Sequence, residues 1–82
     1  MRVSVDRSDR VGFAAFREAR RRGKVEIYLD GLPMTRVIAA DDVLGFVRVH
    51  CTDADGRVVL NDAKDGTRQL VLYGTVRIEV AA

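Results

Sequence analysis

The spacing of the apolar residues changes once along this chain, at Gly23, and that change limits the folds open to it. Before Gly23, apolar side chains recur with the period of an α-helix, whereas after it they alternate with polar ones, as in a half-buried β-strand. Short alternating runs separated by turn residues then continue to the end of the chain. The sequence therefore predicts one helix near the N-terminus, followed by a sheet of local antiparallel strands.

The predicted helix extends from Ser8 or Asp9 to Arg22, after a short strand over residues 2–5. Either Ser8 or Asp9 can accept a hydrogen bond from the first free amides of a helix, and glycine commonly follows a last helical residue. The apolar stripe of this helix contains Gly12, Phe13, Ala15, Phe16 and Ala19. Because the stripe is narrow, we expect the helix to pack on the sheet with one face.

The first long strand is predicted over residues 25–30, and Asp30-Gly31 at its end is a strong signal for a tight hairpin. Pro33 has no amide hydrogen to donate, so it belongs at a sheet edge or in a loop. A second strand over residues 35–40 is expected to return alongside the first.

Further strands are predicted over residues 45–51, 57–60, 69–73 and 75–80, with a polar loop at 61–66. The last two strands form one alternating stretch that Gly74 interrupts, which indicates a bulge or a sharp bend at that residue. These five to six short strands predict an α+β fold over residues 1–82, a single domain. In it, the N-terminal helix packs on a small curled antiparallel sheet, either a half-barrel or a sandwich.

Charge is distributed unevenly along the 82 residues. The first 24 residues carry eight Lys or Arg against three Asp or Glu, a balance of +5, while the balance of the remaining residues is −3. Such a dipolar distribution favours association with an oppositely charged surface and says little about catalysis. No apolar run approaches the roughly 20 residues that span a bilayer, so we expect a cytoplasmic protein without membrane contact.

The residue types that perform chemistry are few and poorly placed for it. Cys51 is the single cysteine, and His50 beside it points to the opposite face of a strand, so the two cannot act as nucleophile and base. Asp53 and Asp55 begin a pattern like that of a calcium loop, but apolar residues follow where further oxygen ligands belong, and a β-turn explains the pattern. We therefore expect no enzyme activity, no metal site and no cofactor.

The basic residues around the end of the predicted helix are the strongest candidate for a binding surface. This basic cluster contains Arg17, Arg20, Arg21, Arg22 and Lys24. Three further residues, Tyr28, Met34 and Phe46, indicate apolar exposure that fits docking or self-association. Two alternatives stay open for the cluster, a solvated helix face or a contact for the phosphates of a nucleic acid. A protein partner is favoured because the rest of the chain is acidic and lacks a basic strand face with interleaved aromatics.

A resemblance adds a biological setting. Residues 25–34 are VEIYLDGLPM and residues 37–42 are VIAADD; GFV at 45–47, an Asp-x-Asp-Gly turn and LYGTVRI at 72–78 follow. Over about residues 24–80, this layout resembles small uncharacterised β-rich proteins encoded by tailed phages and prophages. The resemblance implies a virion component or an inhibitor of host defence, and it assigns a role to no individual residue.

Together these observations predict a non-enzymatic protein-binding module, a small phage accessory or virion component that self-associates or docks on a phage or host protein. One alternative is a stoichiometric inhibitor of a host defence complex, of the anti-CRISPR type. Another is a nucleic-acid-binding module that uses the basic helix. The expected location is the cytoplasm of the host cell or the virion.

Overall fold

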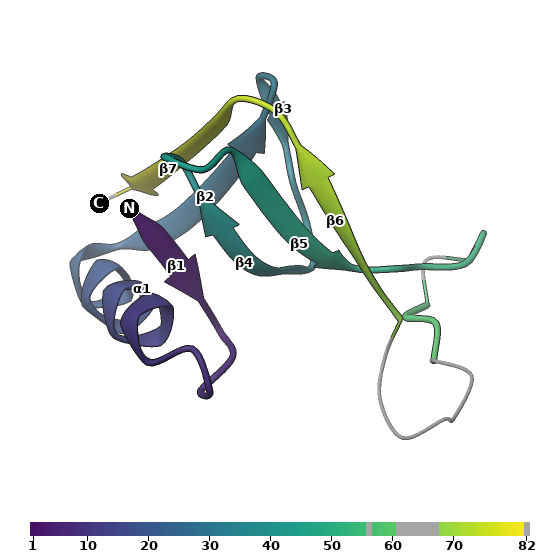
Figure 1. The fold of residues 1–82 in the computed structure, drawn as a ribbon, viewed down its shortest axis with the longest axis horizontal. Helices are drawn as coiled ribbons and strands as arrows, with labels where there is room; N and C mark the ends of the chain where they lie inside the picture. The colour runs from purple at the N-terminus through teal and green to yellow at the C-terminus, as the bar shows by residue number, and fades with distance from the viewer. Residues whose placement is uncertain (56, 61–67, 82) are drawn as a thin grey trace.

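One helix packs on two antiparallel sheets in the computed structural model, which describes residues 1–55, 57–60 and 68–81 (Figure 1). The elements are β1 (Arg2–Ser4), α1 (Arg10–Arg22), β2 (Lys24–Leu29), β3 (Leu32–Pro33), β4 (Val37–Asp41), β5 (Phe46–His50), β6 (Gln69–Tyr73) and β7 (Val76–Ala81). One sheet has the strand order β1-β4-β5-β6, and the other has the order β3-β2-β7. The α+β class with its N-terminal helix is confirmed, and the described strands number seven and divide between two sheets.

The ends of α1 lie where the capping residues predict them. Asp9 is the N-cap, and its Oδ1 accepts hydrogen bonds from the Gly12 amide at 3.1 Å and from the Arg2 guanidinium at 2.8 Å. At the other end, the Gly23 amide donates to the Ala19 carbonyl at 3.1 Å. Ala19 is fully buried, and Phe16 packs against the core, so the apolar stripe does face the sheets.

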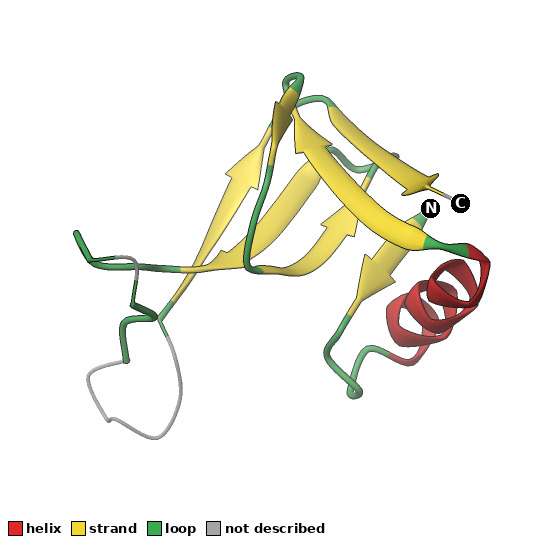
Figure 2. Ribbon diagram, turned by 180° about the vertical axis from the view of Figure 1, so that it is seen from behind, coloured by secondary structure: helices red, strands yellow, loops and turns green. Residues whose placement is uncertain are grey.

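The hairpin signal is also confirmed. Asp30 and Gly31 both have positive φ angles, 50° and 82°, and they join β2 to β3 with Leu29 opposite Leu32. This is the backbone of a two-residue turn whose twist matches that of the flanking strands. Figure 2, the view from behind, shows β2 running from the end of α1 to this turn. Pro33 lies in β3, an edge strand of its sheet, as its missing amide requires.

The expected return of the next strand alongside β2 is wrong. β4 pairs with β1 on one side and with β5 on the other, so it belongs to the other sheet. The chain leaves β2 after Met34, whose amide donates the last hydrogen bond of this pairing, to the Ile27 carbonyl. Arg36 then adopts a φ of 56°, a left-handed conformation that turns the backbone toward β4.

The predicted bend at Gly74 is confirmed, and it is the point at which the chain passes from one sheet to the other. β6 pairs with β5, whereas β7 pairs with β2 along six residues. The Gly74 amide donates to the Gly45 carbonyl at 3.0 Å, and the Thr75 amide donates to Oδ1 of Asp30 at 2.9 Å. These two contacts hold the corner between the sheets closed.

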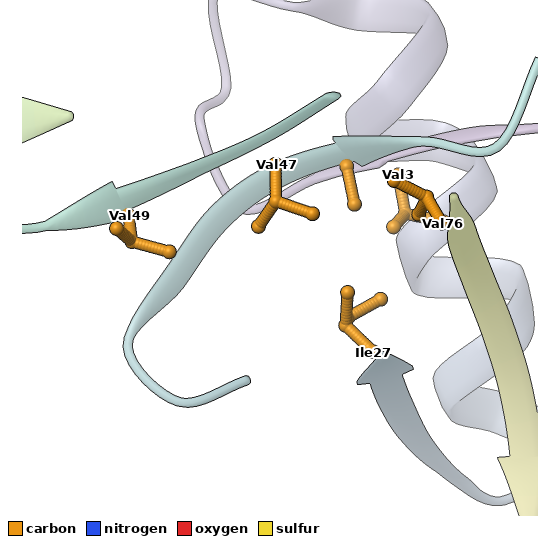
Figure 3. Close-up of a cluster of buried hydrophobic side chains, with 6 residues drawn as sticks. Val3, Ile27, Val47, Val49 and Val76 are labelled. Carbon is orange, nitrogen blue, oxygen red and sulfur yellow. The ribbon is translucent and has the colours of Figure 1, made fainter. Parts of the chain in front are cut away.

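The core lies between the two sheets and is aliphatic. Its buried members are Val3, Ile27, Ala40, Val47, Val49 and Val76. Figure 3 shows Val47 and Val49 of β5 on one side of the interior and Ile27 of β2 on the other. The predicted strand at 57–60 is reduced to isolated bridge residues, of which Val58 pairs with Thr52. The predicted loop at 61–66 lies outside the described residues.

Three carboxylates, those of Asp6, Asp9 and Asp41 at the end of β4, have pKa values below their usual range. Asp41 is buried, and its Oδ1 accepts from the amides of Leu44 and Val43, each at 2.9 Å. These hydrogen bonds hold the pKa of Asp41 below its usual value. The pKa of Asp6 is lowered by its bonds to Ser8, and that of Asp9 is lowered by the amide at the start of α1.

Because these pKa values are lower in the folded chain, we expect the free energy of unfolding to be highest above about pH 4 and to fall as the pH drops further. Urea unfolding at a series of pH values between neutral and about pH 2 measures this. The Asp41→Asn variant keeps an oxygen acceptor and loses the titration, so it should lose less stability than the wild type over the same acid range. A wild-type chain as stable at about pH 2 as at neutral pH contradicts this account.

Candidate protein interface

A groove of about 440 Å³ opens beside β2. Its walls are β2, the segment 33–38 that leads from β3 into β4, the end of β1, and Phe16 of α1. The side chains of Val5, Phe16, Val25, Met34 and Val37 give it an apolar lining. We call it the β2 groove, and its size and lining are those of many ligand-binding clefts.

The backbone of β2 is only half paired on the groove side. Toward β7 the pairing includes all residues from Lys24 to Leu29, but toward β3 it includes only Tyr28 and Leu29. The Met34 amide adds one further hydrogen bond, to the Ile27 carbonyl at 2.8 Å. Backbone groups alternate in direction along a strand, so the N–H and C=O of Val25 point to the same side as those of Ile27. Among the described strands, none pairs with residues 24–26 on that side.

The rim of the β2 groove is a linked set of charged and polar side chains. The Tyr28 hydroxyl donates to Oε2 of Glu26 at 2.9 Å, and the Arg77 guanidinium lies 4.4 Å from the centroid of the Tyr28 ring. The hydrogen bond to Glu26 and the charge of that carboxylate raise the pKa of Tyr28, which keeps its hydroxyl a donor. Nζ of Lys24 lies 3.9 Å from Oε1 of the same Glu26.

The basic cluster lies next to this rim, because α1 ends two residues before Lys24. All five of its members are exposed. Arg21 makes an i,i+3 ion pair of 3.6 Å with Glu18, and Arg17 lies 5.9 Å from the centroid of the Phe13 ring. Within the described part of the chain, Arg20 and Arg22 make no ion pair. Exposed pairs such as that of Arg21 are weak, so these cations remain available to a partner.

The structure brings most of the predicted residues together. Lys24, Tyr28 and Met34 all line the β2 groove, and Arg20, Arg21 and Arg22 form the helix end that leads into it, with Arg17 one turn earlier. Phe46 lies apart from them, in β5 of the other sheet. It is half-buried and sits opposite Tyr73 of β6.

An exposed apolar strand, β6, was not predicted from the sequence as a candidate surface. Tyr73, Leu70 and Val71 of β6 have exposed fractions of 77%, 48% and 41%. β6 is also an edge strand, with a sheet neighbour on one side only among the described strands. The available signal was its composition, because QLVLY contains neither a charged residue nor a proline, the residues that usually protect an edge.

The turn at Asp53, the cysteine and the histidine lie outside the β2 groove. Oδ1 of Asp53 accepts from the amides of Asp55 and Arg57 at 2.9 and 3.0 Å, so this carboxylate closes its own turn. Cys51 is partly exposed, and His50 is half-buried at the end of β5. In residues 1–55, 57–60 and 68–81, no three His, Cys, Asp or Glu side chains converge as a metal site.

No protein-family model, no curated protein and no solved structure matches this chain. The resemblance to phage-encoded proteins therefore stays a prediction. Over the residues that the structure describes, no helix is both long and apolar enough to cross a membrane.

Proposed function

We propose that this protein is a binding module without catalytic activity, and that it holds an acidic, extended segment of another protein in the β2 groove. The observation that carries the proposal is the half-paired edge of β2, which opens into an apolar groove beside the basic cluster. An extended peptide can add to such an edge as a strand, and its backbone then satisfies the free groups of Val25.

The lining of the groove specifies the side chains of the occupant. Side chains of an added strand alternate between the groove and the solvent. Those that point inward meet Phe16, Val25 and Met34, so they should be apolar. Those that point outward lie near Lys24 and the end of α1, so acidic side chains suit them.

Positive side chains gather at the end of the groove where β2 begins. Lys24 starts β2, and three arginines in the last turn of α1 precede it. Its ion pair with Glu26 spans 3.9 Å with the Lys24 side chain 74% exposed, so a carboxylate of a partner can replace that contact at little cost. The positive charge is therefore concentrated where the free backbone of β2 begins.

The test uses a short synthetic peptide in which Glu and Val alternate, with a peptide of alternating Lys and Val as its counterpart. We expect the acidic peptide to bind and to shift the NMR amide signals of Val25, Ile27 and Met34. Lys24→Glu places a negative charge at the rim and should weaken binding about tenfold. Val25→Pro removes the amide that faces the groove and should also weaken binding about tenfold, while the pairing of β2 with β7 is kept.

The matched control is Arg10→Glu, which makes the same change of charge at the opposite, exposed end of α1. It should leave peptide affinity unchanged, and circular dichroism checks that all variants are folded. A second probe, a single-stranded oligonucleotide of mixed sequence, tests the nucleic-acid alternative. The proposal is overturned if only the oligonucleotide binds, with affinity falling steeply as salt rises, or if the acidic peptide binds without moving the β2 amides.

A further inference from the structure

The two sheets have four borders, and the structure protects three of them. β3 has two residues, one of them Pro33. β7 carries Arg77 and Glu79, which form an ion pair of 2.9 Å. β1 has three residues and lies against α1. Short length, proline and charge are the usual means by which proteins prevent a sheet edge from pairing with another chain.

In the part of the chain that the structure describes, the fourth border, β6, has none of these protections. Its five residues, Gln69–Tyr73, pair with β5 in continuous register, without a bulge. Figure 1 shows β6 at the edge of its sheet, with β5 as its strand neighbour. The exposed side chains of Val71 and Tyr73, with Phe46 opposite Tyr73, add an apolar strip along this border.

The hydrogen bonds at both ends of β6 show which of its backbone groups point toward β5 and which point away from it. The Cys51 amide donates to the Arg68 carbonyl at 2.9 Å, and the Gly74 amide donates to the Gly45 carbonyl at 3.0 Å. Both pairs continue the register of β5 with β6. Because direction alternates along a strand, Leu70 and Leu72 direct their backbone groups toward β5. Those of Gln69, Val71 and Tyr73 therefore point away from the sheet.

This free edge is self-complementary. The three residues with outward backbone groups are placed symmetrically about Val71, which lies at the centre of the five-residue strand. In an antiparallel pairing of two copies, Val71 meets Val71 of the second copy, and Gln69 meets Tyr73. Every outward N–H and C=O of β6 then has a partner in the second copy. Because β6 contains no charged residue, no like charges meet at the two-fold axis that relates the copies.

We propose that two copies of this chain form a two-fold dimer through antiparallel pairing of β6 with β6, centred on Val71. The dimer joins the two four-stranded sheets into one, and it covers the apolar strip that each copy exposes. An interface of this type is closed, so assembly stops at two copies. The inference goes beyond the proposed function, because the β6 edge and the β2 groove belong to different sheets.

Size-exclusion chromatography with light scattering, which measures the molecular mass over a range of protein concentrations, tests the dimer. We expect the wild type to be dimeric, and Val71→Lys to raise the dissociation constant at least about 100-fold, because two like charges then meet on the axis. Val80→Lys is the matched control, since Val80 has a similar exposed fraction, 38%, on the β7 border. It should remain dimeric, and Val71→Lys should keep its affinity for the acidic peptide.

A measurement on the wild type keeps the test valid if Val71→Lys fails to fold. Amide hydrogen exchange at Val71 and Tyr73 should be slow in the dimer and should become fast on dilution, while exchange at Leu70 and Leu72 stays slow at all concentrations. A wild type that is monomeric at about 1 mM overturns the proposal. So does a dimer that Val80→Lys dissociates and Val71→Lys does not.

Discussion

Val47→Asp is expected to unfold this protein at neutral pH. Val47 has no exposed surface, and it lies in β5 between Ala40 of β4 and Leu72 of β6. A carboxylate at this position faces the aliphatic core, where no described group is placed to pair with it. Burial of an unpaired charge costs several kcal/mol, and a chain of this length has a total stability of roughly 4–12 kcal/mol.

Circular dichroism and urea unfolding measure this effect against two other variants. Val43→Asp makes the same change at a residue that is 79% exposed in the turn after β4, and it should change stability by less than about 0.5 kcal/mol. Val47→Ala removes only apolar volume, so it should stay folded with a loss of about 1–3 kcal/mol. A Val47→Asp chain with a native spectrum at neutral pH would mean that β5 does not form the centre of the core.

Gly45→Ala is expected to be the most disruptive single-methyl change in the turn regions. Gly45 has a φ of 74°, and a Cβ built on it lies 2.7 Å from the carbonyl oxygen of Gly74. The clash is with backbone, and the two residues are also joined by the hydrogen bond from the Gly74 amide to the Gly45 carbonyl. Neither residue can move away without opening the corner between the sheets, so we expect a loss of about 3 kcal/mol or more.

Gly31→Ala serves as the control for Gly45→Ala, because it introduces the backbone strain of a positive φ without a clash. Gly31 has a similar φ of 82°, but a Cβ there has no neighbouring atom within 4 Å. This variant should lose only about 1 kcal/mol, the cost of a left-handed conformation for alanine. Equal losses in the two variants, measured by urea unfolding, would show that the corner between Gly45 and Gly74 is not tightly closed.

The free edge of β6 and the β2 groove differ in how far sequence could anticipate them. Alternation in residues 69–73 predicts a strand, but nothing local indicates that this strand lies at a border. Edge position depends on which strands pair, and pairing is set by contacts between distant residues. The basic cluster, by contrast, was evident in the sequence, since its members are close neighbours along the chain. Its position beside the β2 groove required the path of residues 33–38.

Sequence alone determined the local structure of this protein. Asp9 and Gly23 mark the ends of the helix, Asp30-Gly31 forms the hairpin, and the period of two assigns the residues of β5 to its two faces. These features depend on backbone preferences within a few residues. Tertiary structure decided that β4 joins β1 and β5, that β2 stays half paired, and that β6 is left at a border. The physical reason is that alternation fixes which face of a strand is apolar, whereas its partners are chosen by the closure of the whole core.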